Sequence, residues 1–166
     1  MRRMLASRRF RLLLEIAAIV LVLLAVRAYT QRGVVHGTAP SLAGPLLDGG
    51  RADLAALRGR PVLVHFWATW CPVCRLELSS IDAIAKDYTV ITVAQQSGSA
   101  ASIRAYLKKH DVDFPVVADP DGVLSRRFGV RAVPASFVIG PRGRIRFVEV
   151  GYTTGLGLRA RLWWVR

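Results

Sequence analysis

The only two cysteines of the chain, Cys71 and Cys74, stand three positions apart between two segments of different pattern. Residues 62–67 are rich in β-branched and aromatic side chains, which is typical of a strand. Residues 72–85 carry apolar side chains at a spacing closer to helical than to alternating. Cys71 is therefore expected to begin a helix, and the pair is expected to perform dithiol and disulfide chemistry.

The predicted position of the cysteines has three physical consequences. Residues three apart lie on one face of a helix, so the two sulfur atoms can reach bonding geometry. Unpaired N–H groups and the positive end of the helix dipole favour a thiolate at Cys71, which is the expected nucleophile. Pro72 suits the first turn because its missing N–H costs nothing there. Cys74, one turn further on, is the expected resolving thiol.

A Cys-x-x-Cys pair can also be half of a zinc site or a purely structural disulfide. Zinc requires four ligands, and His36, His65 and His110 form no second ligand pair. A disulfide that closes so short a loop gives the smallest entropic gain. We therefore expect redox exchange as the role of the pair, with no metal and no cofactor.

The segment FWATWCPVCRLEL, followed later by GVRAVP before a strand, resembles the thioredoxin superfamily. Residues 59–71 resemble its membrane-anchored bacterial branch, the TlpA/ResA-like proteins that include cytochrome c maturation thioredoxins. With a CPVC pair and a histidine before FWATWC, the suppressor-of-copper-sensitivity protein D family is the most similar one. The resemblance covers residues 37–166 and implies a thioredoxin-like α/β fold with a mixed central sheet flanked by helices.

The resemblance also implies a cis-proline opposite the cysteines, and Val133-Pro134 matches that position. From the residues alone, a proline here marks only the entry to a strand. In the superfamily the residue before this proline offers backbone groups to an extended substrate, so Val133 is an expected substrate contact. Trp70 is expected to form an apolar platform for the substrate, beside Pro72 and Val73.

His65 occupies the strand position where many members of the superfamily have a buried Asp, Glu or Asn that exchanges a proton with the resolving cysteine. A buried neutral imidazole titrates in the useful range and can accept a proton from Cys74. The alternative is a hydrogen-bonded core histidine without a catalytic role, and the sequence leaves both open. Ser79 stands where relatives often have a proline, so the chain lacks the proline that would kink the helix after the cysteines.

The amino-terminal segment predicts a membrane anchor. A basic stretch, residues 1–11, precedes an apolar run that begins at residue 12 and reaches a spanning length if it extends to residue 29. Five arginines precede the run and two follow it, which predicts a cytoplasmic amino terminus. A cleaved signal peptide is the alternative, although Arg27 fits a cleavage site poorly. We expect a single-pass protein of the bacterial inner membrane with its catalytic domain in the oxidising periplasm.

After the anchor, residues 30–44 are predicted to be a linker and residues 45–166 a single thioredoxin-like domain. Helical patterns separated by short strands predict a layered α/β fold, and a closing hairpin at 141–143 makes the sheet mixed. The main predicted strands are 61–67, 89–94, 114–117, 135–140 and 145–150. The main predicted helices are 72–87, 101–110, 122–128 and 156–164. Trp67 is expected in the core, and Trp163 and Trp164 are expected to pack through the last helix.

The formal net charge of +13 does not indicate a nucleic-acid-binding protein. Seven arginines and one glutamate give the first 32 residues +6, and 17 basic and 10 acidic residues give the remainder +7. A domain that is exported from the cytoplasm does not encounter nucleic acid there, and no nucleic-acid recognition motif accompanies the arginines. A solvated arginine-rich face, anionic lipid headgroups or an acidic protein partner are the alternatives for the domain's charge.

The resemblance implies a reductase of protein disulfides that is recharged by a membrane-embedded electron donor. The direction of exchange depends on the reduction potential, so a disulfide oxidase or isomerase is the first alternative. Two thiolates can also hold Cu(I), which makes a copper-binding module the second alternative. A peroxidase acting through Cys71 is the third alternative. A cysteine pair at the start of a helix fits thiol–disulfide exchange better than peroxidase activity. Copper tolerance and cytochrome c maturation are the processes that the resemblance suggests.

Overall fold

The computed structural model describes residues 2–30 and 33–166, which belong to two compact units divided between residues 32 and 33. The first unit is helix α1 (Arg2–Thr30), which includes the predicted anchor, 12–29. Among the residues described, no helix has both the length and the apolar composition that crossing a membrane requires.

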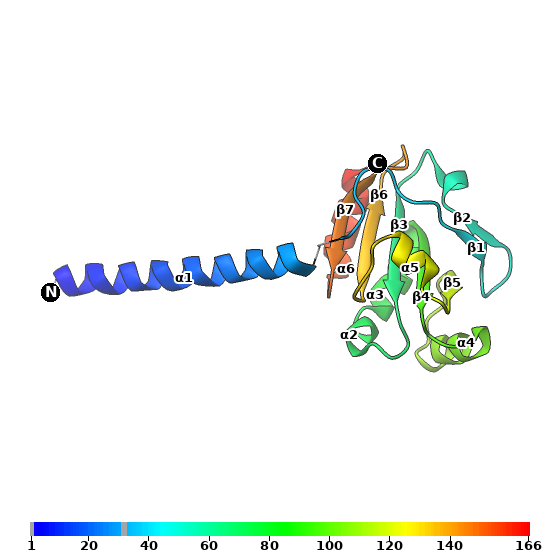
Figure 1. Ribbon diagram of the computed structural model, residues 1–166, viewed down its shortest axis with the longest axis horizontal. Coiled ribbons are helices and arrows are strands. Elements are labelled where there is room, and N and C mark those ends of the chain that lie inside the picture. Colours follow the sequence, from blue (N-terminus) through cyan, green and yellow to red (C-terminus); the bar gives the residue numbers. More distant parts are fainter. Residues whose placement is uncertain (1, 31–32) are drawn as a thin grey trace. The chain divides into compact units, whose positions relative to one another are not determined.

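The second unit holds the remaining helices and strands (Figure 1). In chain order they are β1 (Ala43–Pro45), β2 (Arg51–Asp53), the 3₁₀ helix η1 (Ala55–Leu57), β3 (Val62–Trp67), α2 (Pro72–Arg75), α3 (Leu78–Asp87), β4 (Thr89–Gln95), α4 (Ala100–Lys109), β5 (Val116–Asp119), α5 (Val123–Arg127), β6 (Ala135–Ile139), β7 (Ile145–Val150) and α6 (Gly155–Trp164).

A five-stranded sheet in the order β5-β4-β3-β6-β7 forms the centre of the domain. Strands β3, β4 and β5 are parallel, whereas β6 is antiparallel to both β3 and β7, so the predicted mixed sheet is confirmed. Strand β3 is central and buried at every position, as its continuous apolar run predicts. Its carboxyl end leads into the cysteine segment, which places the disulfide at one end of the sheet.

Two apolar cores cover the two faces of the sheet. One face packs against α3, α4 and α6, for example through Ile81, Ile103 and Leu158. The other packs against α5 and the β1–β2 hairpin, with a cluster of aromatic rings that includes Phe66 and Phe128 at a centroid distance of 5.2 Å. Trp67 is fully buried as expected. The result is a layered α/β domain in which β3 is held rigidly between two packed faces.

Residues 33–42, which precede β1, pack against the rest of this domain. Val34 and Leu42 are buried in the core, and the amides of Val35 and Ala39 bond to the carbonyls of Phe128 and Gly143. The compact unit therefore begins at residue 33 and takes in residues 33–44, most of the predicted linker.

Two predicted elements differ from the structure. The predicted helix 72–87 is two helices, because α2 ends at Arg75 and α3 begins at Leu78. Tighter hydrogen bonds join them, from the amides of Leu76 and Glu77 to the carbonyls of Val73 and Cys74. The predicted strand 114–117 lies two residues later, at β5, because pairing with β4 begins at Val116.

The packing predicted for the last two tryptophans is wrong. The side chains of Trp163 and Trp164 are 63% and 70% exposed, whereas Leu158 and Leu162 provide the buried face of α6. A run of two tryptophans cannot place both rings on that face, since adjacent residues of a helix point about 100° apart.

Candidate active site

The two cysteines form a disulfide at the amino end of α2, with their Cα atoms 5.3 Å apart. Cys71 is the N-cap residue of this helix and Pro72 occupies its first turn, as the sequence predicts. The amide of Cys74 donates a hydrogen bond to Cys71 Sγ over 3.1 Å. Because α2 has only four residues, this single N–H, rather than the dipole of a long helix, is the local group that favours a thiolate at Cys71.

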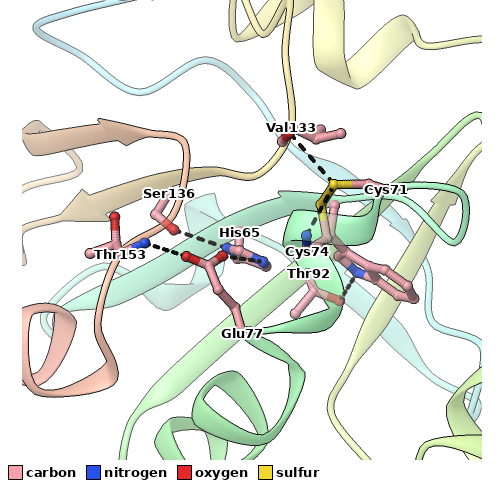
Figure 2. Close-up of polar contacts among 9 residues, drawn as sticks. His65, Cys71, Cys74, Glu77, Thr92, Val133, Ser136 and Thr153 are labelled. Atoms are coloured by element: carbon pink, nitrogen blue, oxygen red, sulfur yellow. Dashed lines mark hydrogen bonds and ion pairs between the residues drawn. A yellow bond between two sulfur atoms is a disulfide. The ribbon is translucent and has the colours of Figure 1, made fainter. Parts of the chain in front are cut away.

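The loop that enters β6 lies opposite Cys71 (Figure 2). The Val133-Pro134 bond is cis, as the resemblance predicts. Cys71 Sγ lies 3.6 Å from the carbonyl oxygen of Val133, so the predicted proline loop and the nucleophile are brought together. When Cys71 is a thiol, this carbonyl oxygen can accept its proton in a hydrogen bond.

Apolar side chains surround the disulfide on the surface. Trp70 is 59% exposed, and Pro72 and Val73 are also exposed. The indole N–H of Trp70 donates to the carbonyl of Gln96 over 3.1 Å, which fixes the ring against the loop after β4. Gln96 has a φ of +45°, a left-handed conformation that a glutamine adopts rarely, so the surrounding loop must hold it there. No local pattern of residues predicts this contact.

Behind the disulfide, three buried side chains and the partly buried amide of Thr153 form a polar chain (Figure 2). His65 on β3 faces its register partner Ser136 on β6, with 2.9 Å between Nδ1 and Oγ. On its other side, Nε2 of His65 lies 3.8 Å from Oε2 of Glu77, whose carboxylate points toward the ring. The amide of Thr153 donates to Oε1 of Glu77. His65 and Glu77 are only 2% and 1% exposed, so water does not screen their interaction.

Burial shifts both ionisable members of this chain in opposite directions. It lowers the pKa of His65 from 6.5 to about 3, so the imidazole is neutral at pH 7. It raises the pKa of Glu77 from 4.5 to about 7, against the opposing effect of the hydrogen bond from Thr153. The expectation that His65 titrates in the useful range is therefore wrong, because complete burial disfavours its cation. Glu77 is the group that titrates near neutral pH.

Glu77 was not singled out in the sequence, although its spacing carried a signal. It follows Cys74 by three positions and precedes Ile81 by four, and both of these residues are buried. A carboxylate at that spacing falls on the buried face of the helix, where it needs a polar partner. The helix is interrupted between α2 and α3, at Leu76 and Glu77. Glu77 still lies on the buried face, one turn after the resolving cysteine.

The raised pKa of Glu77 predicts a measurable pH dependence of stability. The folded protein holds this proton more tightly than the unfolded chain, so the free energy of unfolding falls as the pH rises from about 4.5 to about 7. Glu77→Gln removes the buried charge, and we expect the free energy of unfolding at pH 8 to rise by on the order of 2 kcal/mol.

Urea denaturation of the oxidised protein at pH 8 and pH 4.5 checks this expectation. The two proteins should differ clearly at pH 8 and little at pH 4.5, where Glu77 is protonated in the fold. Equal stabilities at both pH values would show that Glu77 is solvated as an ordinary surface carboxylate.

Metal ligands are not gathered near the disulfide. Among the described residues, no group of three or more His, Cys, Asp and Glu side chains is placed to hold an ion. His36, His65 and His110 are not brought together with the cysteines, apart from His65 behind them in the buried chain.

The fold and the site define the class of this protein. A thioredoxin-like α/β domain with a Cys-x-x-Cys disulfide capping a helix opposite a cis-proline is a thiol:disulfide oxidoreductase. The chain belongs to the AhpC/TSA family, whose family model matches residues 35–148.

Curated relatives and solved structures agree with this class. A thioredoxin-like protein of Haemophilus influenzae is 33% identical over 144 residues, which cover 86% of each chain. The thiol-disulfide oxidoreductase ResA of Bacillus subtilis is 30% identical over 82% of this chain and 83% of its own. The crystal structure of a thioredoxin-family thiol:disulfide interchange protein from Chlorobium tepidum superposes with a TM-score of 0.68, at 27% identity, over 79% of this chain and 97% of its own.

Proposed function

We propose that this protein is a membrane-anchored, periplasmic thiol:disulfide oxidoreductase that reduces disulfides in protein substrates. The observation that carries the proposal is the hydrogen bond from the Cys74 amide to Cys71 Sγ, beside the Val133 carbonyl. It stabilises negative charge on the sulfur that faces the proline loop, and so selects Cys71 as the nucleophile.

The proposed reaction has two exchange steps. The Cys71 thiolate attacks one sulfur of the substrate disulfide, which forms a mixed disulfide and releases the other substrate sulfur as a thiolate. The Cys74 thiolate then attacks Cys71 Sγ, which releases the second substrate thiolate and leaves the Cys71–Cys74 disulfide that the structure contains. Two electrons pass to the substrate, and a membrane-embedded dithiol donor returns them by the reverse exchange.

Glu77 is proposed to accept the proton that Cys74 loses before the second step. Its position one turn after Cys74 and its pKa of about 7 suit a general base that works near neutral pH. Neutral His65 is proposed to position the Glu77 carboxylate, with Ser136 fixing the ring from the opposite side. Trp70, Pro72, Val73 and Val133 are proposed to contact the substrate.

The anchor and the compartment are part of the proposal. The apolar run from residue 12, the arginines before it and its continuous helical conformation in α1 support a single-pass anchor with the domain outside the cytoplasm. The described apolar side chains of α1 are exposed; Leu21, for example, would gain from lipid contact. The associations with copper tolerance and cytochrome c maturation remain predictions from the resemblance.

Alkylation trapping in cells tests the proposed direction and location together. Cells that carry the full chain are quenched with acid, and free thiols are labelled with a reagent that adds mass to each. We expect the pair to be mostly reduced, and the protein to stay in the membrane pellet after alkaline carbonate extraction. A mostly oxidised pair in cells with intact reductases would instead indicate a disulfide oxidase.

A further inference from the structure

A second concave site lies at the end of the sheet opposite the disulfide. It is a pocket of about 450 Å³ between the β6–β7 turn and the end of α6, lined by Arg142, Arg144, Arg146, Arg166, Pro141 and Trp164 among others. Strand β6 begins beside Pro134 and ends at Ile139, next to this turn, so the pocket is about 17 Å from the proline at 3.4 Å per residue. Figure 1 shows the carboxyl terminus at the upper end of the sheet and α2 at the lower end.

The pocket concentrates positive charge from separate parts of the chain. Arg142, Arg144 and Arg146 come from the turn and the start of β7, and all three are exposed. Beside the pocket, the loop before β3 carries Arg58, whose Nε would be 3.4 Å from a Cβ placed on Gly143. The amide of Gly59 bonds to the carbonyl of Pro141 over 2.9 Å, which holds that loop beside the turn.

This charge is not neutralised within the domain. Among the residues that the structure describes, no ion pair joins a carboxylate to Arg58, Arg142, Arg144 or Arg146. The carboxylate at the end of α3, Asp87, is occupied by Arg159 at 2.6 Å. Unpaired guanidinium groups gathered around one hollow repel one another, and a bound anion would remove that repulsion.

The shape and the chemistry of the pocket favour one class of anion. A guanidinium forms two parallel hydrogen bonds to phosphate oxygens. Several guanidinium groups together match the multiple negative charges of a phosphate group better than the single charge of a carboxylate. The volume is that of small-molecule sites, so it admits more than one ion. Trp164, 70% exposed at the rim, offers an indole face to the uncharged part of such a ligand.

We propose that this pocket binds a phosphate-bearing anion, a phosphate ester or a diphosphate group, through Arg142, Arg144 and Arg146. The site is separate from the disulfide and does not depend on the proposed direction of thiol exchange. The phosphate can belong to a soluble molecule or to a phospholipid headgroup, and the experiment distinguishes these two sources.

Calorimetric titration of the full chain in nanodiscs of phosphatidylcholine, with pyrophosphate as the probe at 150 mM salt, tests the proposal. We expect one pyrophosphate per chain, and an affinity at least about tenfold weaker for Arg144→Gln with Arg146→Gln. The matched control, Arg51→Gln with Lys109→Gln, removes the same charge from exposed positions that do not line the pocket, and should change the affinity by less than about twofold.

Two results would overturn the proposal. Equal losses in the two double variants would show that only overall charge attracts the probe, as would a hexaglutamate peptide binding as tightly as pyrophosphate. When binding is specific, nanodiscs with added phosphatidylglycerol identify the source. Loss of pyrophosphate binding in those discs indicates a lipid headgroup, and unchanged binding indicates a soluble phosphate compound. Thiol exchange measured on the same samples verifies that each variant is folded.

Discussion

Cys71→Ser is expected to abolish disulfide exchange, whereas Cys74→Ser is expected to stop it halfway. Without the Cys71 sulfur no mixed disulfide can form, so the rate should fall to that of the uncatalysed reaction, a loss on the order of 10³-fold or more. With Cys71 intact and Cys74 replaced, the first exchange proceeds but the mixed disulfide has no internal thiol to resolve it. The variant should then remain covalently bound to its substrate.

Intact-mass spectrometry with a model peptide disulfide distinguishes these outcomes. Cys74→Ser should show the mass of the protein plus one half of the peptide disulfide, removable by dithiothreitol, and Cys71→Ser should show no adduct. Adducts on Cys71→Ser but not on Cys74→Ser would reverse the assigned roles. The hydrogen bonding argues against that reversal, because the amide of Cys74 donates to Cys71 Sγ, which also faces the Val133 carbonyl.

The same Cys74→Ser variant also identifies substrates in cells. Complexes trapped in the membrane fraction can be separated by size before and after reduction, and each released protein is a candidate substrate. The wild-type chain is the matched control, since it resolves its complexes and should yield few. This use of the variant requires only that the first exchange step is intact.

The sequence predicted the fold well because its signals were local and continuous. Strand β3 could be found from residues 62–67, and the position of Cys71 at a helix start followed from the segment boundaries alone. The break between α2 and α3 was not predicted, because the apolar spacing from residue 72 to 85 continues across it. At the interruption the amides of Leu76 and Glu77 bond to carbonyls three residues back, a change in hydrogen bonding that apolar spacing does not reveal.

The roles of Cys71 and Cys74 could be predicted from the sequence, whereas the contacts of the residues around them could not. The pairing of His65 with Ser136 depends on the register of β3 against β6, which no local pattern specifies. The lowered pKa of His65 likewise depends on tertiary packing, because the elements that cover the sheet exclude water from the ring. Trp70 was expected to form an apolar platform for the substrate, but its hydrogen bond to Gln96 depends on the position of the loop after β4.

The buried chain explains why a histidine is tolerated at a position where an acid is common in the superfamily. The acid of this protein comes instead from Glu77, one turn after the cysteines, and the strand supplies its neutral partner. Two acids at these positions would face each other without water, and mutual repulsion would raise the pKa of one of them further. A neutral imidazole avoids that repulsion.

Glu77→Gln is expected to slow the second exchange step by on the order of 10²-fold at pH 7.5, while the alkylation rate of Cys71 stays nearly unchanged. Because the ionised carboxylate is the base, the wild-type rate of resolution should rise with pH through about 7 and then level off. In the variant this inflection should be absent, since the amide does not titrate. Stopped-flow measurement of mixed-disulfide decay between pH 5.5 and 9 provides both the rate and the profile.

Asp82→Asn is the matched control, because Asp82 is also a shielded carboxylate of the same helical segment but pairs with Lys86 instead of His65. It should leave the inflection near pH 7 in place. His65→Asn should move the inflection rather than remove it, since the base is still present but its neighbour has changed. If the Glu77→Gln profile keeps the inflection near pH 7, another group is responsible for the titration. Glu77 would then have only a structural role.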